Sequence, residues 1–63
     1  MADIRWEEPF CAEGSACFRL GTDENGNAYI AVAGAEDAYV TDTREALRTL
    51  IREIKAGKAD HLL

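Results

Sequence analysis

The chain has 63 residues, which is enough for one small domain and too few for two. Its formal net charge of −5 disfavours binding to phosphate backbones and to anionic membrane surfaces. No apolar run approaches the roughly 18 residues that a membrane span requires, and the N-terminal residues are charged rather than leader-like. We therefore expect a cytoplasmic protein without a membrane partner, whose cysteines are reduced thiols.

The charge is divided unevenly along the chain. Residues 1–42 hold nine acidic and two basic side chains, which gives −7. Residues 43–63 hold three acidic and five basic side chains, which gives +2. The C-terminal part is therefore the one locally basic region.

Residues 1–14 show no hydrophobic period and are predicted to form an irregular or short extended arm. Pro9 argues against a helix in this arm. Trp6 and Phe10 are isolated large apolar residues that need to be covered. We expect them to cap the open end or the second face of a sheet, and to anchor a partner if they are exposed.

Residues 16–42 predict an antiparallel sheet. The pattern indicates strands over residues 16–20, 28–33 and 38–41, because apolar side chains alternate at period two. Asn25-Gly26 favours a hairpin turn between the first two strands, and a second turn covers residues 34–37. The predicted sheet is a three-stranded meander, with a fourth strand as the alternative.

Residues 44–56 predict the C-terminal helix. Thr43 is a suitable N-cap residue, and Gly57 is suited to the left-handed conformation that ends a helix. One apolar stripe follows helical spacing and should cover one face of the sheet: it comprises Leu47, Leu50, Ile51 and Ile54. Residues 58–63 form a tail that ends on two leucines. The expected fold class is therefore α+β, a small meander packed by one C-terminal helix.

The sequence favours no catalytic, metal or cofactor site. Cys11, Cys17 and His61 leave a tetrahedral zinc site one ligand short, and the spacing of the two cysteines is not that of known zinc motifs. A disulfide between the cysteines is within reach along the chain, but the expected compartment disfavours it. His61 lies near the C-terminus, where a general base lacks rigid support. We expect a protein that is not an enzyme.

Arg44, Arg48 and Arg52 recur every four residues and form a basic stripe beside the apolar face of the helix. A solvated helix face is one interpretation, since Glu45 and Glu53 partly neutralise the stripe. The other is an interface for acidic residues or phosphates. The candidate partner-binding residues are Trp6, Phe10, Arg44, Arg48 and Arg52.

The order of these segments resembles the actinobacterial domain of unknown function 397 family, which includes BldB-like small regulators. The matching residues are Trp6, the stretches 13–20, 30–33 and 39–43, and the ending 55–63. The chain departs from the family pattern at Ala33-Gly34-Ala35 and at Leu47. The resemblance implies a non-enzymatic accessory protein whose partner is a helix-turn-helix transcription regulator, in developmental or antibiotic-production control.

The leading functional hypothesis is therefore a small regulatory protein that binds such a regulator, with a homodimer as a further expected assembly. A toxin- or antitoxin-like element is one alternative. A direct DNA-binding protein is another, and it depends on the arginine stripe alone.

Overall fold

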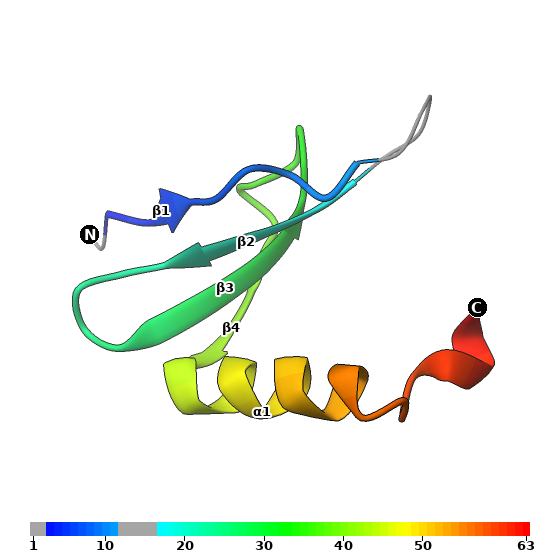
Figure 1. The fold of residues 1–63 in the computed structure, drawn as a ribbon. Coiled ribbons are helices and arrows are strands. Elements are labelled where there is room, and N and C mark those ends of the chain that lie inside the picture. Colours follow the sequence, from blue (N-terminus) through cyan, green and yellow to red (C-terminus); the bar gives the residue numbers. More distant parts are fainter. Residues whose placement is uncertain (1–2, 12–16) are drawn as a thin grey trace.

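The computed structural model describes residues 3–11 and 17–63. Its elements are four strands, β1 (Arg5–Trp6), β2 (Phe18–Thr22), β3 (Asn27–Val32) and β4 (Val40–Thr43), then α1 (Arg44–Lys55) and a short 3₁₀ helix, η1 (Asp60–Leu62). The strands form one antiparallel sheet in the order β1-β2-β3-β4, and α1 runs beneath one face of it (Figure 1). This confirms the α+β fold class and the alternative of a fourth strand.

The fourth strand comes from the predicted arm. Trp6 lies opposite Gly21, and the backbone N–H of Glu7 donates to the carbonyl of Leu20 at 2.8 Å. The predicted end of the arm at Gly14 and the predicted start of the next strand at Ala16 lie outside the described residues. The arm is thus ordered by backbone pairing along β2 rather than irregular over its described part.

A bulge interrupts this pairing. Trp6 lies opposite Gly21 and Phe10 opposite Phe18, so four steps along the arm match three steps along β2. One extra residue therefore sits in the arm near Pro9, which has no N–H to donate. Because side chains alternate between faces, the extra residue sends Trp6 and Phe10 to opposite faces of the sheet.

The hairpin between β2 and β3 is fixed by Asp23. One oxygen of its carboxylate accepts the backbone N–H groups of Asn25 and Asn27 at 2.9 and 3.0 Å, and the other accepts the Tyr29 hydroxyl at 2.5 Å. Gly26 has a φ of +82°, whereas Asn25 does not enter the left-handed region. The loop is therefore longer than the two-residue turn that Asn-Gly favours, with a single left-handed residue at its end.

The helix begins and ends as predicted, within one residue. The Thr43 hydroxyl accepts the backbone N–H of Ala46 at 3.1 Å, as an N-cap does. At the other end, the N–H of Gly57 donates to the Ile54 carbonyl and the N–H of Lys58 to the Glu53 carbonyl. With Gly57 at a φ of +91°, these two bonds form a Schellman motif.

The face of the sheet away from α1 carries an aromatic cluster. Trp6, Tyr29 and Tyr39 contact one another, with ring centroids 5.0 to 6.5 Å apart. Trp6 therefore caps the second face of the sheet, which is one of the two positions expected from the sequence. Tyr29 is buried, and so are Ala28 and Ala31 on the same strand, so the best-covered part of the molecule is β3 itself.

The helix covers the other face only in part. Ala46 and Leu47 are half-buried, but Leu50 and Ile51 are each 42% exposed and Ile54 is 49% exposed. No residue of α1 is buried. The expectation that the apolar stripe of α1 covers a sheet face therefore holds only at the start of the helix.

We predict that Gly21→Ala destabilises the fold by about 1–3 kcal/mol, because the new methyl group overpacks the arm. A Cβ at this position would lie 2.8 Å from Ile4 Cγ2 and 2.9 Å from Trp6 Cε3. Urea unfolding followed by Trp6 fluorescence measures both the stability and the displacement of the arm. A variant with unchanged stability and emission would show that the arm is not packed on β2.

We also predict an acid-sensitive contribution from Asp23. The hydrogen bond from Tyr29 is the largest cause that lowers the pKa of Asp23 from 3.8 to about 2, followed by the N–H of Asn27. Because the folded-state pKa is the lower one, this stabilisation is present above pH 3.8 and is lost as the pH falls from 3.8 to about 2.

The melting temperature should therefore differ between the wild type and Asp23→Asn at pH 6, and the two should converge towards pH 2. Asp37→Asn, at an exposed position in the next turn, is the matched control and should follow the wild type throughout. A gap between wild type and Asp23→Asn that stays constant with pH would contradict this role of the carboxylate.

Candidate interaction surface

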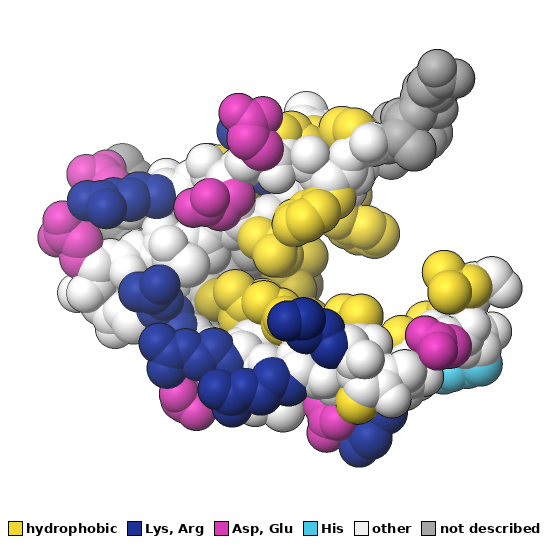
Figure 2. Space-filling model, in the orientation of Figure 1, with side chains coloured by type: hydrophobic (Ala, Val, Ile, Leu, Met, Phe, Trp, Pro, Cys, Tyr) yellow, Lys and Arg dark blue, Asp and Glu magenta, His cyan; other side chains and the backbone are white. Residues whose placement is uncertain are grey.

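An open space between the sheet and α1 is the main surface feature of the described chain. A half-open cavity of about 330 Å³ lies at its narrow end, where α1 leaves β4. The lining residues are Ala28, Ile30, Val40, Thr41, Asp42, Thr43, Ala46, Leu47 and Leu50. From there the space widens along α1, and apolar side chains follow both walls (Figure 2).

The open end of this space is apolar as well. Phe18 is paired with Val32 on β3 and with Phe10 on the arm, so these three side chains share the face that α1 only partly covers. Phe10 and Phe18 are each 65% exposed. On the helix, Ile51 and Ile54 continue the stripe that begins at Leu47. We call the cavity and this continuation together the apolar cleft.

The exposure of the cleft is large for a chain of this size. Of the ten large apolar residues that are exposed in the described part of the chain, seven belong to the cleft: Phe10, Phe18, Val32, Val40, Leu50, Ile51 and Ile54. A large contiguous apolar surface of this kind, rimmed by charge, is typical of an interaction site.

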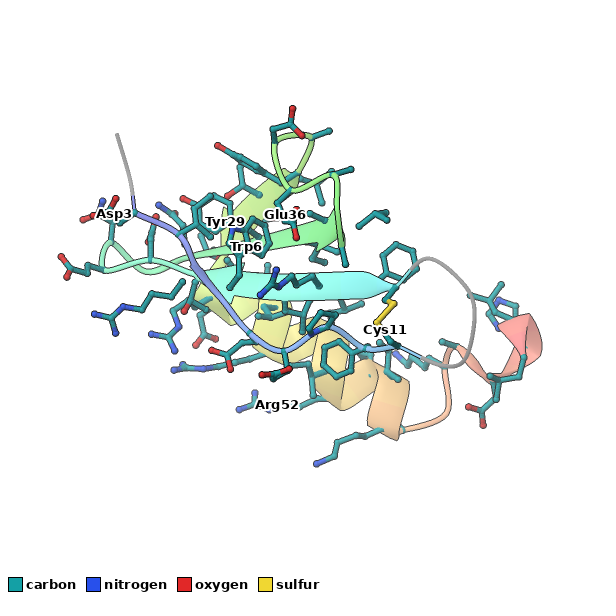
Figure 3. The ribbon with its side chains drawn as sticks, turned by 90° about the horizontal axis from the view of Figure 1, so that it is seen from above. Asp3, Trp6, Cys11, Tyr29, Glu36 and Arg52 are labelled. Carbon is teal, nitrogen blue, oxygen red and sulfur yellow. A yellow bond between two sulfur atoms is a disulfide. The ribbon has the colours of Figure 1, made fainter. Side chains whose placement is uncertain are left out.

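The basic stripe lies along one rim of the cleft. Figure 2 shows a row of dark-blue side chains over α1 below the opening, and Figure 3 places Arg52 beyond the sheet on the same side as the arm. Arg48 donates to Glu45 at 2.8 Å, in a pair that is exposed on both sides. Within residues 3–11 and 17–63, no ion pair engages Arg44 or Arg52.

The five candidate binding residues do not form one surface. Phe10 lies at the open end of the cleft, and Arg44, Arg48 and Arg52 lie on its helix rim. Trp6 lies on the opposite face of the sheet, half-buried against Tyr29 (Figure 3). The structure therefore groups four of the candidates and gives Trp6 a packing role.

Sequence reasoning missed Phe18 as a member of this surface. It also missed that the two phenylalanines are neighbours, although Phe10-Cys11 and Cys17-Phe18 mirror each other across the intervening residues. This mirrored order is the signal that two strands meet here, and it could have indicated the pair.

The expectation of two free thiols is wrong, because Cys11 and Cys17 form a disulfide. The cause is the strand pairing: with Phe10 opposite Phe18, the two cysteines are the next residues to face each other. Their Cα atoms are 4.7 Å apart, close to the roughly 4.5 Å of opposed residues in a pair without backbone hydrogen bonds. The disulfide therefore holds Phe10 beside Phe18 at the mouth of the cleft.

Two carboxyl groups have clearly lowered pKa values, and both serve turns. Asp23 holds the first hairpin, as described above. In the second turn, the N–H of Gly34, then the backbone N–H of Glu36 itself and the guanidinium of Arg19, lower the pKa of Glu36. Perturbed groups often mark catalytic sites, but here the hydrogen bonds that hold the turns account for both shifts.

The other described side chains that could support catalysis or metal binding are not grouped into one site. His61 is in η1, at the far end of the chain from the sheet hairpins. In the part of the chain that the structure describes, no three His, Cys, Asp or Glu side chains are grouped to hold a metal ion. The same part contains no helix that is both long enough and apolar enough to cross a bilayer.

Comparison with known proteins gives no relative: no family model, no curated protein and no solved structure matches the chain.

We predict that breaking the disulfide lowers the free energy of unfolding by on the order of 2 kcal/mol, as the loop-entropy account gives for so short a loop. The change is Cys11→Ser with Cys17→Ser, and urea unfolding measures it beside the wild type with and without a reductant. The double variant and the reduced wild type should agree. Reduction that leaves the unfolding midpoint unchanged would contradict the pairing.

Proposed function

We propose that this chain is a small non-enzymatic regulatory protein that acts by binding another protein through the apolar cleft. The observation that carries the proposal is that seven of ten exposed large apolar residues among those described belong to this one surface. Aromatic anchors surrounded by a charged rim are typical of binding hot spots. Phe10 and Phe18 are such anchors, and the arginines of α1 supply the rim.

The basic rim favours a partner with acidic residues around an apolar centre. Arg44 and Arg52 are exposed and engage no carboxylate of the described chain, so they are available for charge-assisted hydrogen bonds. Opposite charge at the rim accelerates association and fixes orientation more than it adds affinity. The apolar centre then supplies most of the binding free energy.

The resemblance to the domain of unknown function 397 family supports a helix-turn-helix transcription regulator as the partner. The support rests on the order of the matching segments, including the Cys17 strand and the ending at residues 55–63. On this proposal the chain acts on the regulator, and the net charge of −5 favours protein rather than DNA as the surface that it contacts.

The test is affinity capture of the tagged chain from lysate of its own cells, with proteins identified by mass spectrometry. The wild type should recover a helix-turn-helix regulator in near-stoichiometric amount. Phe18→Thr and Arg52→Glu should each reduce its recovery by about tenfold or more, since they remove an anchor and reverse a rim charge.

Asp37→Arg is the matched control, because Asp37 is exposed in the turn before β4 and engages no ion pair among the described residues. It should leave capture unchanged. Capture that none of the cleft variants reduces would refute the cleft as the interface, and purified chain that binds duplex DNA in low salt would favour the DNA-binding alternative.

A further inference from the structure

We propose that a second copy of this chain covers the apolar cleft when no other protein does. The two copies form a two-fold dimer in which the basic helix of each lies against the acidic sheet wall of the other. This inference rests on the proposed function in one respect, since both require the cleft to be an interface.

The first argument is area. The accessible surface of the chain is 5119 Å², whereas a compact monomer of 6.9 kDa has about 4,000 Å². The excess, about 1,100 Å², is comparable with the roughly 800 Å² that one partner contributes to a standard interface. The chain therefore exposes more surface than a compact monomer, and the seven exposed apolar side chains of the cleft contribute to this excess.

The second argument is shape. The radius of gyration is 12.4 Å, while a compact chain of this length has about 10.6 Å. α1 contributes to this extent, because it leaves the sheet at its start and stays half-exposed along its second half (Figure 1). Each copy is therefore a wedge with one helical wall, and the helix of one copy can enter the opening of the other.

The third argument is charge, and it selects a copy of this chain among all apolar partners. The sheet side of the cleft carries the exposed carboxylates of Glu7 and Glu8, and the helix side carries the exposed guanidinium groups of Arg44, Arg48 and Arg52. Figure 2 shows the basic row on the helix side of the opening and acidic side chains on the sheet side.

A two-fold axis places each patch against the partner's other patch. The arginines of one helix therefore meet acidic residues of the other sheet. Glu7 and Glu8, which follow β1 and are exposed, are the residues on that wall that we assign to this contact. In this arrangement, a surface with one basic and one acidic edge is complementary to its own copy. A surface whose edges all carry the same charge is not.

Sedimentation equilibrium of the purified, disulfide-bonded chain tests the proposal. The wild type should be a dimer at concentrations above about 10 μM and should dissociate on dilution. Phe18→Thr should weaken the dimer by about tenfold or more. This residue is exposed in the single chain, so the far-ultraviolet circular dichroism of the variant should remain that of the wild type.

Charge reversal tests the two-fold arrangement itself. One variant carries Arg48→Glu with Arg52→Glu, and the other carries Glu7→Arg with Glu8→Arg. Each alone should be monomeric where the wild type is dimeric, because like charges face each other across the axis. An equimolar mixture should form a heterodimer, in which both contacts pair opposite charges again. Asp37→Arg, which reverses an exposed charge in the turn before β4, should dimerise as the wild type does.

A wild-type chain that remains monomeric at about 200 μM overturns the inference. A dimer that Phe18→Thr and both charge-reversal variants leave intact also overturns it. If the two charge-reversal variants stay monomeric when mixed, the two-fold arrangement is wrong. Failure of this proposal can be told apart from failure of the proposed function. If the chain is monomeric but its cleft variants still lose the captured regulator, only the dimer is refuted. If the cleft variants affect neither capture nor dimerisation, both proposals are refuted.

Discussion

The rest of the structure depends on one constraint: the sheet has two faces to cover, and the chain has few side chains with which to cover them. The far face is closed by three rings, Trp6, Tyr29 and Tyr39, together with the carboxylate of Asp23, which holds the Tyr29 hydroxyl and the adjoining hairpin at once. The near face has only α1, whose apolar side chains from Leu50 onward are 42–49% exposed. With little apolar burial beyond β3, the folded chain has little stability to spare, and further burial against a second chain would be strongly stabilising.

The acidic and basic parts of the sequence also lie in different parts of the structure. The sheet comes from the acidic residues and the helix from the basic ones, so the opening between them is bounded by opposite charges. Among the described residues no ion pair joins α1 to the sheet, and the pairs of the helix are local, such as Arg48 with Glu45. The arrangement leaves both rims available to another molecule. This is the physical basis both for the proposed binding function and for the proposed dimer.

The helix and the first hairpin could be predicted from sequence because their signals are local. Thr43, Gly57 and the spacing from Leu47 to Ile54 depend only on neighbours along the chain, and so does the turn at Asp23 to Gly26. The bulge near Pro9 could not be predicted in this way, since it is a mismatch between two strands and neither strand alone encodes it. It decides that Phe10 faces the cleft while Trp6 packs on the opposite face, and it aligns Cys11 with Cys17. The expectation of free thiols failed for this reason: it was argued from compartment, whereas strand register decided the pairing.

The central claim is that the second half of α1 has no adequate cover within a single chain. Native-state hydrogen exchange, measured residue by residue at low and at high chain concentration, tests it most directly. At low concentration we expect the amides of β3 to be the most protected and those of α1 from Leu50 onward to exchange much faster. At high concentration, or with a bound partner, protection should rise in that half of α1 and around Phe18, while β3 changes little. If α1 is as protected as β3 at low concentration, the helix closes on the sheet in the isolated chain, and the account of an open cleft is wrong.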